Sequence, residues 1–307
     1  MDQNKRYNSI DRYYKQKYGK KVAKISLNGN FSCPNKDGTK GFGGCIFCSK
    51  SGSGDFAGNK ELNILKQFEE IKETMSKKWP DSLYMPYLQA NSNTYGTVEK
   101  LKEVYEPLTT LNDVVGISIA TRADCFNEEI YQYLDDLNKR IPIQIELGLQ
   151  TIHDKTAKLI NRGVSLLEFE TAVKKLREIN IEVVVHIING LPYETKEEMI
   201  ETVKYLNKLD IQGIKIHCLL ILKDTPLETY YQKTNFKMLT LEEYVDITVT
   251  QIEHLRNDII IHRLGADSSV EDLIEPLWSR KKLVLMNEID KLLRKKDSYQ
   301  GILNKQN

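Results

Sequence analysis

Short apolar segments rich in β-branched residues alternate along this chain with longer amphipathic segments, and this alternation restricts the folds it can adopt. The segments that read as strands are residues 22–27, 83–89, 114–120, 143–149, 182–188 and 213–220. The segments that read as helices are residues 61–79, 98–108, 128–139, 166–179 and 196–209. Strands that alternate with helices predict a parallel sheet with right-handed crossover connections.

The number of repeats distinguishes among the parallel α/β folds. Six strands fall short of the eight of a complete TIM barrel, so we predict an α/β fold built on a partial (β/α)6 TIM-type barrel. Residues after 235 read as a helix, a strand and further helices. We therefore expect a partial barrel with a basic N-terminal extension over residues 1–235, and a C-terminal α/β appendage packed on it over residues 236–307. Ligands of such folds bind at the carboxyl ends of the strands.

Composition excludes several classes of protein. The chain has 40% hydrophobic and 28% charged residues, with a formal net charge of +1. No apolar stretch approaches the roughly 18 residues of a membrane span, and the start MDQNKRYNSI lacks the apolar region of a secretory signal. Five cysteines are an odd number for a disulfide framework. These features predict a cytoplasmic protein that does not enter a membrane.

Basic residues gather at the two ends of the chain. Residues 1–24 contain eight basic and two acidic residues, and residues 280–307 contain eight basic and three acidic ones. Tyrosines interleave the N-terminal cations, a combination that suits phosphates and unpaired bases of RNA. Lys5, Arg6 and Arg12 are therefore candidate substrate-binding residues. The alternative is an amphipathic helix whose tyrosines pack on the barrel.

Three of the five cysteines cluster soon after the first predicted strand, in CPNKDGTKGFGGCIFC. Cys33, Cys45 and Cys48 suit two kinds of metal centre. A zinc site would need a fourth ligand, for which the nearest candidates are Cys125 and His153 on other strand ends. A [4Fe–4S] cluster held by three cysteines would instead leave one iron open for a small molecule.

This segment resembles the cluster loop of the radical S-adenosylmethionine (radical SAM) superfamily. Its eleven-residue first gap is similar to the branch of the elongator catalytic subunit and its bacterial relatives. The segments KISLNGNFSCPNKDGTKGFGGCIFC, QANSNTY, HRLGAD and YQG resemble the YtqA/YhcC (MnmL) subgroup. The resemblance implies a partial barrel in which Cys33, Cys45 and Cys48 bind a [4Fe–4S] cluster, with SAM as the second cofactor.

The resemblance also implies contacts to SAM. Phe47 and the 189–192 segment would lie near adenine, Glu146 and Gln150 near ribose, and Arg162 at the methionine carboxylate. Glu146 is alternatively a satisfied carboxylate of the barrel interior, and His186 a core histidine. The residues expected at the SAM site are Phe47, Gln89, Ala90, Asn93, Thr121, Glu146, Gln150, Arg162, His186, Asn189, Gly190, Leu191 and Pro192.

The function implied by the resemblance is tRNA modification through a 5′-deoxyadenosyl radical. The subgroup is implicated in converting wobble 5-carboxymethylaminomethyl-(2-thio)uridine to 5-aminomethyl-(2-thio)uridine. Implied partners are the tRNA anticodon loop, an electron donor such as flavodoxin or ferredoxin, and a downstream tRNA methyltransferase. Alternatives are a radical SAM enzyme for a small molecule or another RNA position, and a zinc-stabilised RNA-binding module without catalysis. No residue is identified as a catalytic acid or base. Further candidates for the substrate side are Tyr84, Tyr87, Tyr95, Lys223, His262 and Arg263.

Overall fold

The computed structural model describes residues 5–52 and 54–304 of the chain. Within these residues, seven strands pair in parallel in the order β1-β2-β3-β4-β5-β6-β8, and β7 pairs with β9 in a separate two-stranded sheet. The large sheet curls but leaves β1 and β8 as its two edges. The strands are β1 (Val22–Leu27), β2 (Leu83–Leu88), β3 (Ile117–Thr121), β4 (Ile143–Gln150), β5 (Glu182–Asn189), β6 (Gly213–Cys218), β7 (Ile221–Leu222), β8 (Ile260–Leu264) and β9 (Leu273–Glu275).

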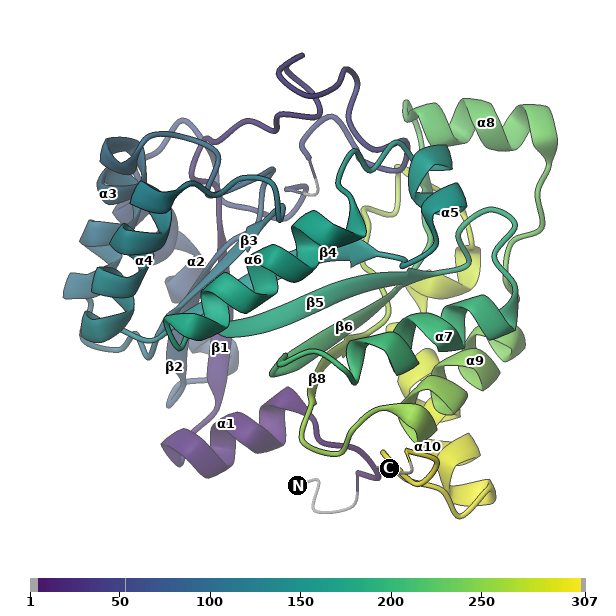
Figure 1. Ribbon diagram of the computed structural model, residues 1–307. Coiled ribbons are helices and arrows are strands. Elements are labelled where there is room, and N and C mark those ends of the chain that lie inside the picture. The colour runs from purple at the N-terminus through teal and green to yellow at the C-terminus, as the bar shows by residue number, and fades with distance from the viewer. Residues whose placement is uncertain (1–4, 53, 305–307) are drawn as a thin grey trace.

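Most helices of the described residues cover the outer face of the curled sheet (Figure 1). The helices are α1 (Ile10–Tyr18), α2 (Ile64–Lys78), α3 (Val98–Tyr105), α4 (Glu128–Arg140), α5 (Asp154–Leu159), α6 (Leu166–Glu178), α7 (Lys196–Leu206), α8 (Pro226–Thr234), α9 (Leu241–His254) and α10 (Lys282–Lys295), with short 3-10 turns at Glu106–Thr110 and Leu277–Arg280. Capping boxes such as Ser165 with Glu168 and Thr195 with Glu198 fix where the crossover helices begin. No helix of the described residues is both long and apolar enough to cross a membrane.

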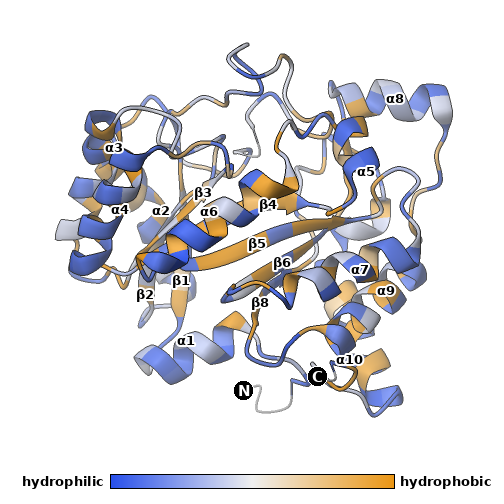
Figure 2. Ribbon diagram, viewed as in Figure 1, coloured by the Kyte–Doolittle hydropathy of each residue, from blue (hydrophilic) through white to orange (hydrophobic). Residues whose placement is uncertain are grey.

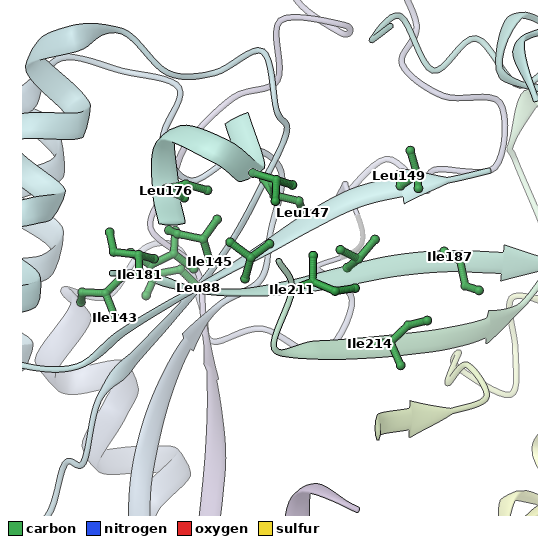
Figure 3. Packing of buried hydrophobic residues seen from close by; sticks show 14 of the residues in the cluster. Leu88, Ile143, Ile145, Leu147, Leu149, Leu176, Ile181, Ile187, Ile211 and Ile214 are labelled. Atoms are coloured by element: carbon green, nitrogen blue, oxygen red, sulfur yellow. The ribbon is translucent and has the colours of Figure 1, made fainter. Parts of the chain in front are cut away.

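The strands carry apolar residues outward and polar residues inward, as β4 shows. In the sequence IQIELGLQ, the alternate residues Ile143, Ile145, Leu147 and Leu149 are buried in the main apolar cluster. Figure 3 shows them with Leu176 of α6 in that cluster, and Figure 2 shows the apolar colouring of the strands. Because side chains alternate along a strand, Gln144, Glu146, Gly148 and Gln150 face the other side, the interior of the partial barrel.

Helix α1 lies at the amino ends of the strands. The Tyr13 hydroxyl contacts Glu182, the first residue of β5, and the Tyr18 hydroxyl donates to the carbonyl of Val115 just before β3. The N–H of Ile261 donates to the carbonyl of Asn8, which joins the chain before α1 to β8. In Figure 1, α1 lies below the sheet, whereas the loop between β1 and α2 arches over its upper edge.

The predicted α/β fold is confirmed, and the six predicted strands are present. The third begins at Ile117 rather than at residue 114, because Val114 forms only an isolated bridge with Tyr84. One strand was not counted in the predicted barrel. β8 belongs to the expected appendage at 236–307, yet it pairs in parallel with β6 and extends the same sheet. The division at residue 235 stays a prediction.

Candidate active site

A cavity of about 270 Å³ lies at the carboxyl ends of the strands. Strands β2 to β6 and β8 contribute to its walls, and the β1–α2 loop contributes Cys33, Cys45 and Cys48. Parallel α/β folds bind their ligands at this end of the sheet. The structure therefore brings the three predicted metal ligands to the place where the fold presents a ligand site.

The cysteine loop is held by its own backbone and by two asparagines. The N–H of Cys48 donates to the carbonyl of Cys45 at 3.0 Å, which forms a tight turn between these two cysteines. Asn35 Nδ2 donates to the carbonyl of Asn161 at 2.6 Å, and Asn161 Nδ2 donates to the carbonyl of Gly44 at 2.8 Å. Gly44 has a φ of 77°, a left-handed conformation that favours glycine. These contacts tie the cysteine loop to the segment after α5.

The surroundings of the cysteines hold at least one of their thiols in the protonated form. A hydrogen bond with Cys48 and burial raise the pKa of Cys45 well above its usual value, while the positive charge of Arg122 opposes this rise. A metal centre requires thiolates, so its binding would release the protons these thiols hold. Within the described residues, no group of three or more His, Cys, Asp or Glu side chains is placed to hold one metal ion.

Arg162 provides an unpaired donor in the same cavity. Its side chain is buried, with Nε donating to the carbonyl of Val164 and Nη1 donating to the carbonyls of Leu149 and Thr151. Nη2 is buried and has no hydrogen-bond partner among the described residues. A buried guanidinium nitrogen of this kind is a ready donor to a carboxylate. This observation fits a group such as SAM, whose methionine part carries a carboxylate.

Arg122 sits between the cysteines and Arg162, and the predicted site did not include it. Its guanidinium forms a two-point pair with Asp124 at 2.9 Å, and Nη1 donates to the carbonyl of Arg162 at 2.8 Å. Burial would lower the pKa of Arg122, but Asp124 and the nearby Cys45 and Cys33 raise it. A permanent positive charge beside thiols favours their ionised, metal-binding form.

Deeper in the barrel, Glu146 accepts hydrogen bonds from four donors. Lys24 Nζ lies 2.5 Å from Oε1 and Ser118 Oγ lies 2.7 Å from it. Oε2 accepts from His186 Nε2 at 2.6 Å and from Lys215 Nζ. A carboxylate offers about four lone-pair sites, so these donors fill its capacity. Glu146 nevertheless lines the cavity, so its expected place near the SAM ribose stays a prediction, while these donors match the alternative of a satisfied carboxylate of the barrel interior.

Burial and charge together set the protonation of this group. Burial alone would raise the pKa of Glu146, but Lys215, Lys24 and His186 hold it well below its usual value. Burial and the charge of Lys215 lower the pKa of His186 to about 4, so its ring is neutral near pH 7. Burial lowers the pKa of Lys215 to about 7, although Glu146 opposes this effect. His186 also lines the cavity, and its expected contact to SAM stays a prediction beside its contact to Glu146.

The structure brings many of the predicted residues to the cavity, where their roles stay predictions. The predicted residues that line it, besides the three cysteines, are Phe47, Tyr87, Gln89, Thr121, Glu146, Gln150, Arg162, His186 and Arg263. Gln150 has a φ of 67°, at a register shift between β4 and β5. Such strain in a residue other than glycine is common where a ligand is held.

Other residues expected at the SAM site have structural partners elsewhere. Asn93 Nδ2 donates to the carbonyls of Leu88 and Ala120, and Ala90 is fully buried beside Gly54. Both residues support the turn after β2 and do not line the cavity.

The segment at the end of β5 also lies outside the cavity lining. Asn189 and Gln251 exchange two hydrogen bonds between their side-chain amides, at 2.8 and 2.9 Å. Gly190 and Leu191 line a second cavity of about 400 Å³, and Pro192 is buried next to them. These residues therefore lie outside the lining of the cavity beside the cysteines, and their expected place near adenine stays a prediction.

Four of the substrate candidates also lie outside the cavity lining. Tyr84 faces α2, with its ring packed edge-on against Phe68 at 6.1 Å, because it lies three residues from the inward-facing Tyr87. Tyr95 forms a hydrogen bond with Thr39 of the cysteine loop at 2.7 Å. Lys223 is exposed on the surface, and His262 is half-buried against Gly213.

The basic N-terminal residues lie at the end of the barrel opposite the cavity, and their predicted contact to substrate stays a prediction. Lys5 pairs with Asp290 and Arg6 pairs with Asp297. Arg12 lies on α1, which closes the amino ends of the strands, whereas the cavity opens at their carboxyl ends. The tyrosines of α1 pack on the barrel, with Tyr14 buried. This matches the alternative of an amphipathic helix; residues 1–4 and 305–307 of the two basic ends lie outside the described residues.

Sequence reasoning missed Lys24, Ser118 and Lys215, although a signal was present. In VAKISL and GIKIHC, one lysine interrupts an apolar strand at a position that shares its face with other polar residues. A buried lysine needs a partner, and such a pattern indicates a polar barrel interior.

Comparison with known proteins decides the family. Residues 38–206 match the radical SAM superfamily, and residues 211–295 match the radical SAM C-terminal domain. The chain belongs to the radical SAM superfamily. Members of this superfamily are enzymes whose cofactors are SAM and a [4Fe–4S] cluster. The cysteines are therefore assigned to an iron–sulfur cluster and not to a structural zinc ion. The cysteine triad and the unpaired Nη2 of Arg162 fit these two groups.

Individual relatives span most of the chain. Protein YtqA of Bacillus subtilis is 46% identical over 297 residues, which cover 97% of this chain and 92% of YtqA. Protein YhcC of Escherichia coli is 32% identical over 279 residues, which cover 91% of this chain and 89% of YhcC. The predicted YtqA/YhcC subgroup of radical SAM proteins is thereby confirmed.

The names of some more distant relatives state a function. A tRNA uridine(34) acetyltransferase of Dehalococcoides mccartyi is 27% identical over 154 residues, which cover 49% of this chain and 32% of that protein. The structure of archaeal Elp3 from Methanocaldococcus infernus superposes with a TM-score of 0.68 at 16% identity, covering 91% of this chain and 64% of that one. The Elp3 likeness shows the same fold.

Proposed function

We propose that this radical SAM enzyme modifies the wobble uridine of tRNA, converting 5-carboxymethylaminomethyl-(2-thio)uridine to 5-aminomethyl-(2-thio)uridine. The observation that carries the proposal is the relationship to a tRNA uridine(34) acetyltransferase, a protein named for action on the same nucleotide. The anticodon loop would enter the cavity with its wobble base unstacked, because single-stranded loops are how proteins usually read RNA bases.

The cavity's chemistry supports this reaction. The side chain to be shortened carries a methylene between an amine and a carboxylate, and both groups weaken its C–H bonds. When bound, the cluster and SAM would supply a radical able to remove one of those hydrogens. Loss of one further electron from the resulting carbon radical to the oxidised cluster would give a C=N bond, and water would hydrolyse it to the free amine and a two-carbon aldehyde acid. Cys33, Cys45 and Cys48 would hold the cluster and Arg162 would bind the SAM carboxylate. The interior polar residues around Glu146 are then left to face the substrate.

The proposal implies partners. An electron donor such as flavodoxin or ferredoxin would reduce the cluster. A tRNA methyltransferase would act next, because 5-aminomethyluridine exposes a primary amine. We place the reaction in the cytoplasm, where tRNA is modified.

Nucleoside mass spectrometry of tRNA from a strain lacking this protein tests the proposal. We expect 5-carboxymethylaminomethyl-uridines to accumulate and their 5-aminomethyl products to disappear, with both restored by the wild-type gene. An unchanged wobble profile would contradict it. A change at another nucleotide would favour the alternative of a different RNA position, and a change confined to metabolites would favour a small-molecule substrate.

A further inference from the structure

Two cations stand side by side on the inner face of the sheet. Lys215 of β6 and Arg263 of β8 are register partners on adjacent parallel strands, and both line the cavity. Like charges placed opposite each other on neighbouring strands are unfavourable unless something else neutralises them. Their position therefore calls for an anion.

The described residues supply too little negative charge for these cations. Glu146 is shared by Lys215 and Lys24. Asp267 is shared by Arg263 at 3.4 Å and Lys282 at 3.0 Å. Two carboxylates thus serve four cations. The other titratable neighbours are histidines, whose pKa values burial lowers, and Tyr87, whose pKa burial raises, so they add no negative charge. Burial lowers the pKa of Lys215 to about 7, and the charges of Lys24 and Arg263 act in the same direction.

A third group next to these cations has an unused polar atom. His217 lies two residues after Lys215 on β6 and also lines the cavity. Its Nε2 is buried without a hydrogen-bond partner among the described residues. Its ring lies 5.1 Å from that of His186, on the neighbouring strand. A neutral histidine can donate from this nitrogen, and a buried polar atom without a partner is costly unless a ligand satisfies it.

We infer that Lys215, Arg263 and His217 form a carboxylate-binding subsite, which holds the terminal carboxylate of the substrate's carboxymethylaminomethyl group. This inference rests on the proposed function. The subsite is separate from Arg162, which follows α5 and is anchored to the carbonyls of Leu149, Thr151 and Val164. One enzyme thus has a cationic group for the carboxylate of SAM and another for the carboxylate of the substrate.

The subsite distinguishes the substrate of the reaction from its product. The methylene that loses hydrogen lies between the carboxylate, which the subsite holds, and the uracil base, which the rest of the RNA holds. The substrate side chain is therefore fixed on both sides of this methylene. The product, 5-aminomethyluridine, has lost that carboxylate and carries an amine, which the cations repel. The subsite therefore binds substrate and releases product.

Equilibrium binding of anticodon stem-loop RNAs tests the inference. Cluster-loaded protein is titrated with RNA carrying either 5-carboxymethylaminomethyl-uridine or 5-aminomethyluridine at the wobble position. We expect the wild type to prefer the first RNA by about tenfold or more, as a charge-assisted hydrogen bond predicts. Lys215→Gln and Arg263→Gln should each remove most of that preference. Lys174→Gln, an exposed lysine of α6, is the matched control and should keep it.

The outcomes separate this inference from the proposed function. Preserved discrimination in folded Arg263→Gln, whose side chain is 35% exposed and tolerates replacement better than Lys215, would overturn the subsite. Loss of SAM affinity in both variants would also overturn it, because the cations would then serve the cofactor. If the wild type converts the RNA but binds the two RNAs equally well, the subsite is contradicted and the proposed function is not. Discrimination without conversion supports the subsite and contradicts the proposed function.

Discussion

Asn35 Nδ2 lies 2.6 Å from the carbonyl oxygen of Asn161, and this hydrogen bond joins the cysteine loop to the segment after α5. Asn161 returns a hydrogen bond to the carbonyl of Gly44, immediately before Cys45. Asn161 also directly precedes Arg162. The loop expected to bind the cluster and the arginine expected to bind SAM are therefore held together by one pair of asparagines.

Removing this link should weaken cluster retention. Asn35→Ala deletes the donor and leaves the carbonyl of Asn161 without this partner, which costs about 1–3 kcal/mol locally. We expect less iron per chain and weaker absorbance near 400 nm after anaerobic reconstitution, with the far-UV circular dichroism unchanged. Asn59→Ala, in an exposed turn of the same β1–α2 connection, serves as the control. Equal iron content in both variants would contradict the role of Asn35.

Arg162→Gln should impair SAM binding. The substitution removes the unpaired Nη2 from the cavity, and the loss of one charge-assisted hydrogen bond predicts about tenfold weaker binding or more. Isothermal titration of reconstituted protein with SAM measures it. Arg177→Gln also removes an arginine bonded to a backbone carbonyl, but on the surface of α6, and should leave SAM affinity unchanged. If Arg162→Gln binds SAM as tightly as the wild type does, Arg162 does not bind the SAM carboxylate.

Glu146→Gln should destabilise the fold strongly. The neutral amide leaves Lys24 and Lys215 in the barrel interior without their shared carboxylate, and breaking a buried pair in this way costs about 3–5 kcal/mol. Urea denaturation measures the free energy of unfolding, with the exposed Glu178→Gln as the control. A loss below about 1 kcal/mol would show that the interior charges are compensated in another way.

The depressed pKa of Lys215 predicts how stability changes with pH. Its pKa is about 7 in the folded protein and about 10.4 in an unfolded chain, so the unfolded state binds more protons between these values. Lys215 therefore makes stability rise as pH increases through this window. Lys215→Met should reduce that rise when urea midpoints are compared at about pH 7 and pH 9.5. An identical rise in wild type and variant would assign it to other groups.

The interface with tRNA should lie at the cavity mouth and away from α1. Lys50 and Lys223 are exposed next to the cavity-lining residues Ser49 and Leu222. Replacing both with glutamine should weaken tRNA binding and reduce its salt dependence by about one unit of slope for each phosphate that is no longer neutralised. Arg12→Gln combined with Lys20→Gln, on and beside α1, should bind tRNA as the wild type does. The reverse result would place tRNA at the other end of the barrel.

The parts of the structure that local patterns encode were predictable. β-branched runs identified the strands, and the position of Cys33, Cys45 and Cys48 after β1 placed them at the ligand-binding end of the sheet. The strand at β8 was predicted as part of the appendage, but its place in the large sheet was not, because its pairing with β6 depends on contacts that no local pattern contains.

The interior of the site was harder to predict, because its contacts span long stretches of sequence. Glu146 meets Lys24 across 122 positions and Lys215 across 69. Tyr84 and Tyr87 are both tyrosines of β2, yet only strand alternation reveals that one faces α2 and the other the cavity. Similarly, no local pattern indicates that Asn189 pairs with Gln251, 62 positions away.

The most direct test of the account is conversion of defined tRNA by the purified protein. Anaerobically reconstituted protein, SAM and a reductant are incubated with tRNA carrying 5-carboxymethylaminomethyl-uridine, and the nucleosides are measured by mass spectrometry beside a Cys45→Ala control. The account predicts 5-aminomethyluridine and 5′-deoxyadenosine with the wild type and neither with the variant. Formation of the product by Cys45→Ala would contradict the account. So would wild-type protein that cleaves SAM but leaves the wobble nucleoside unchanged.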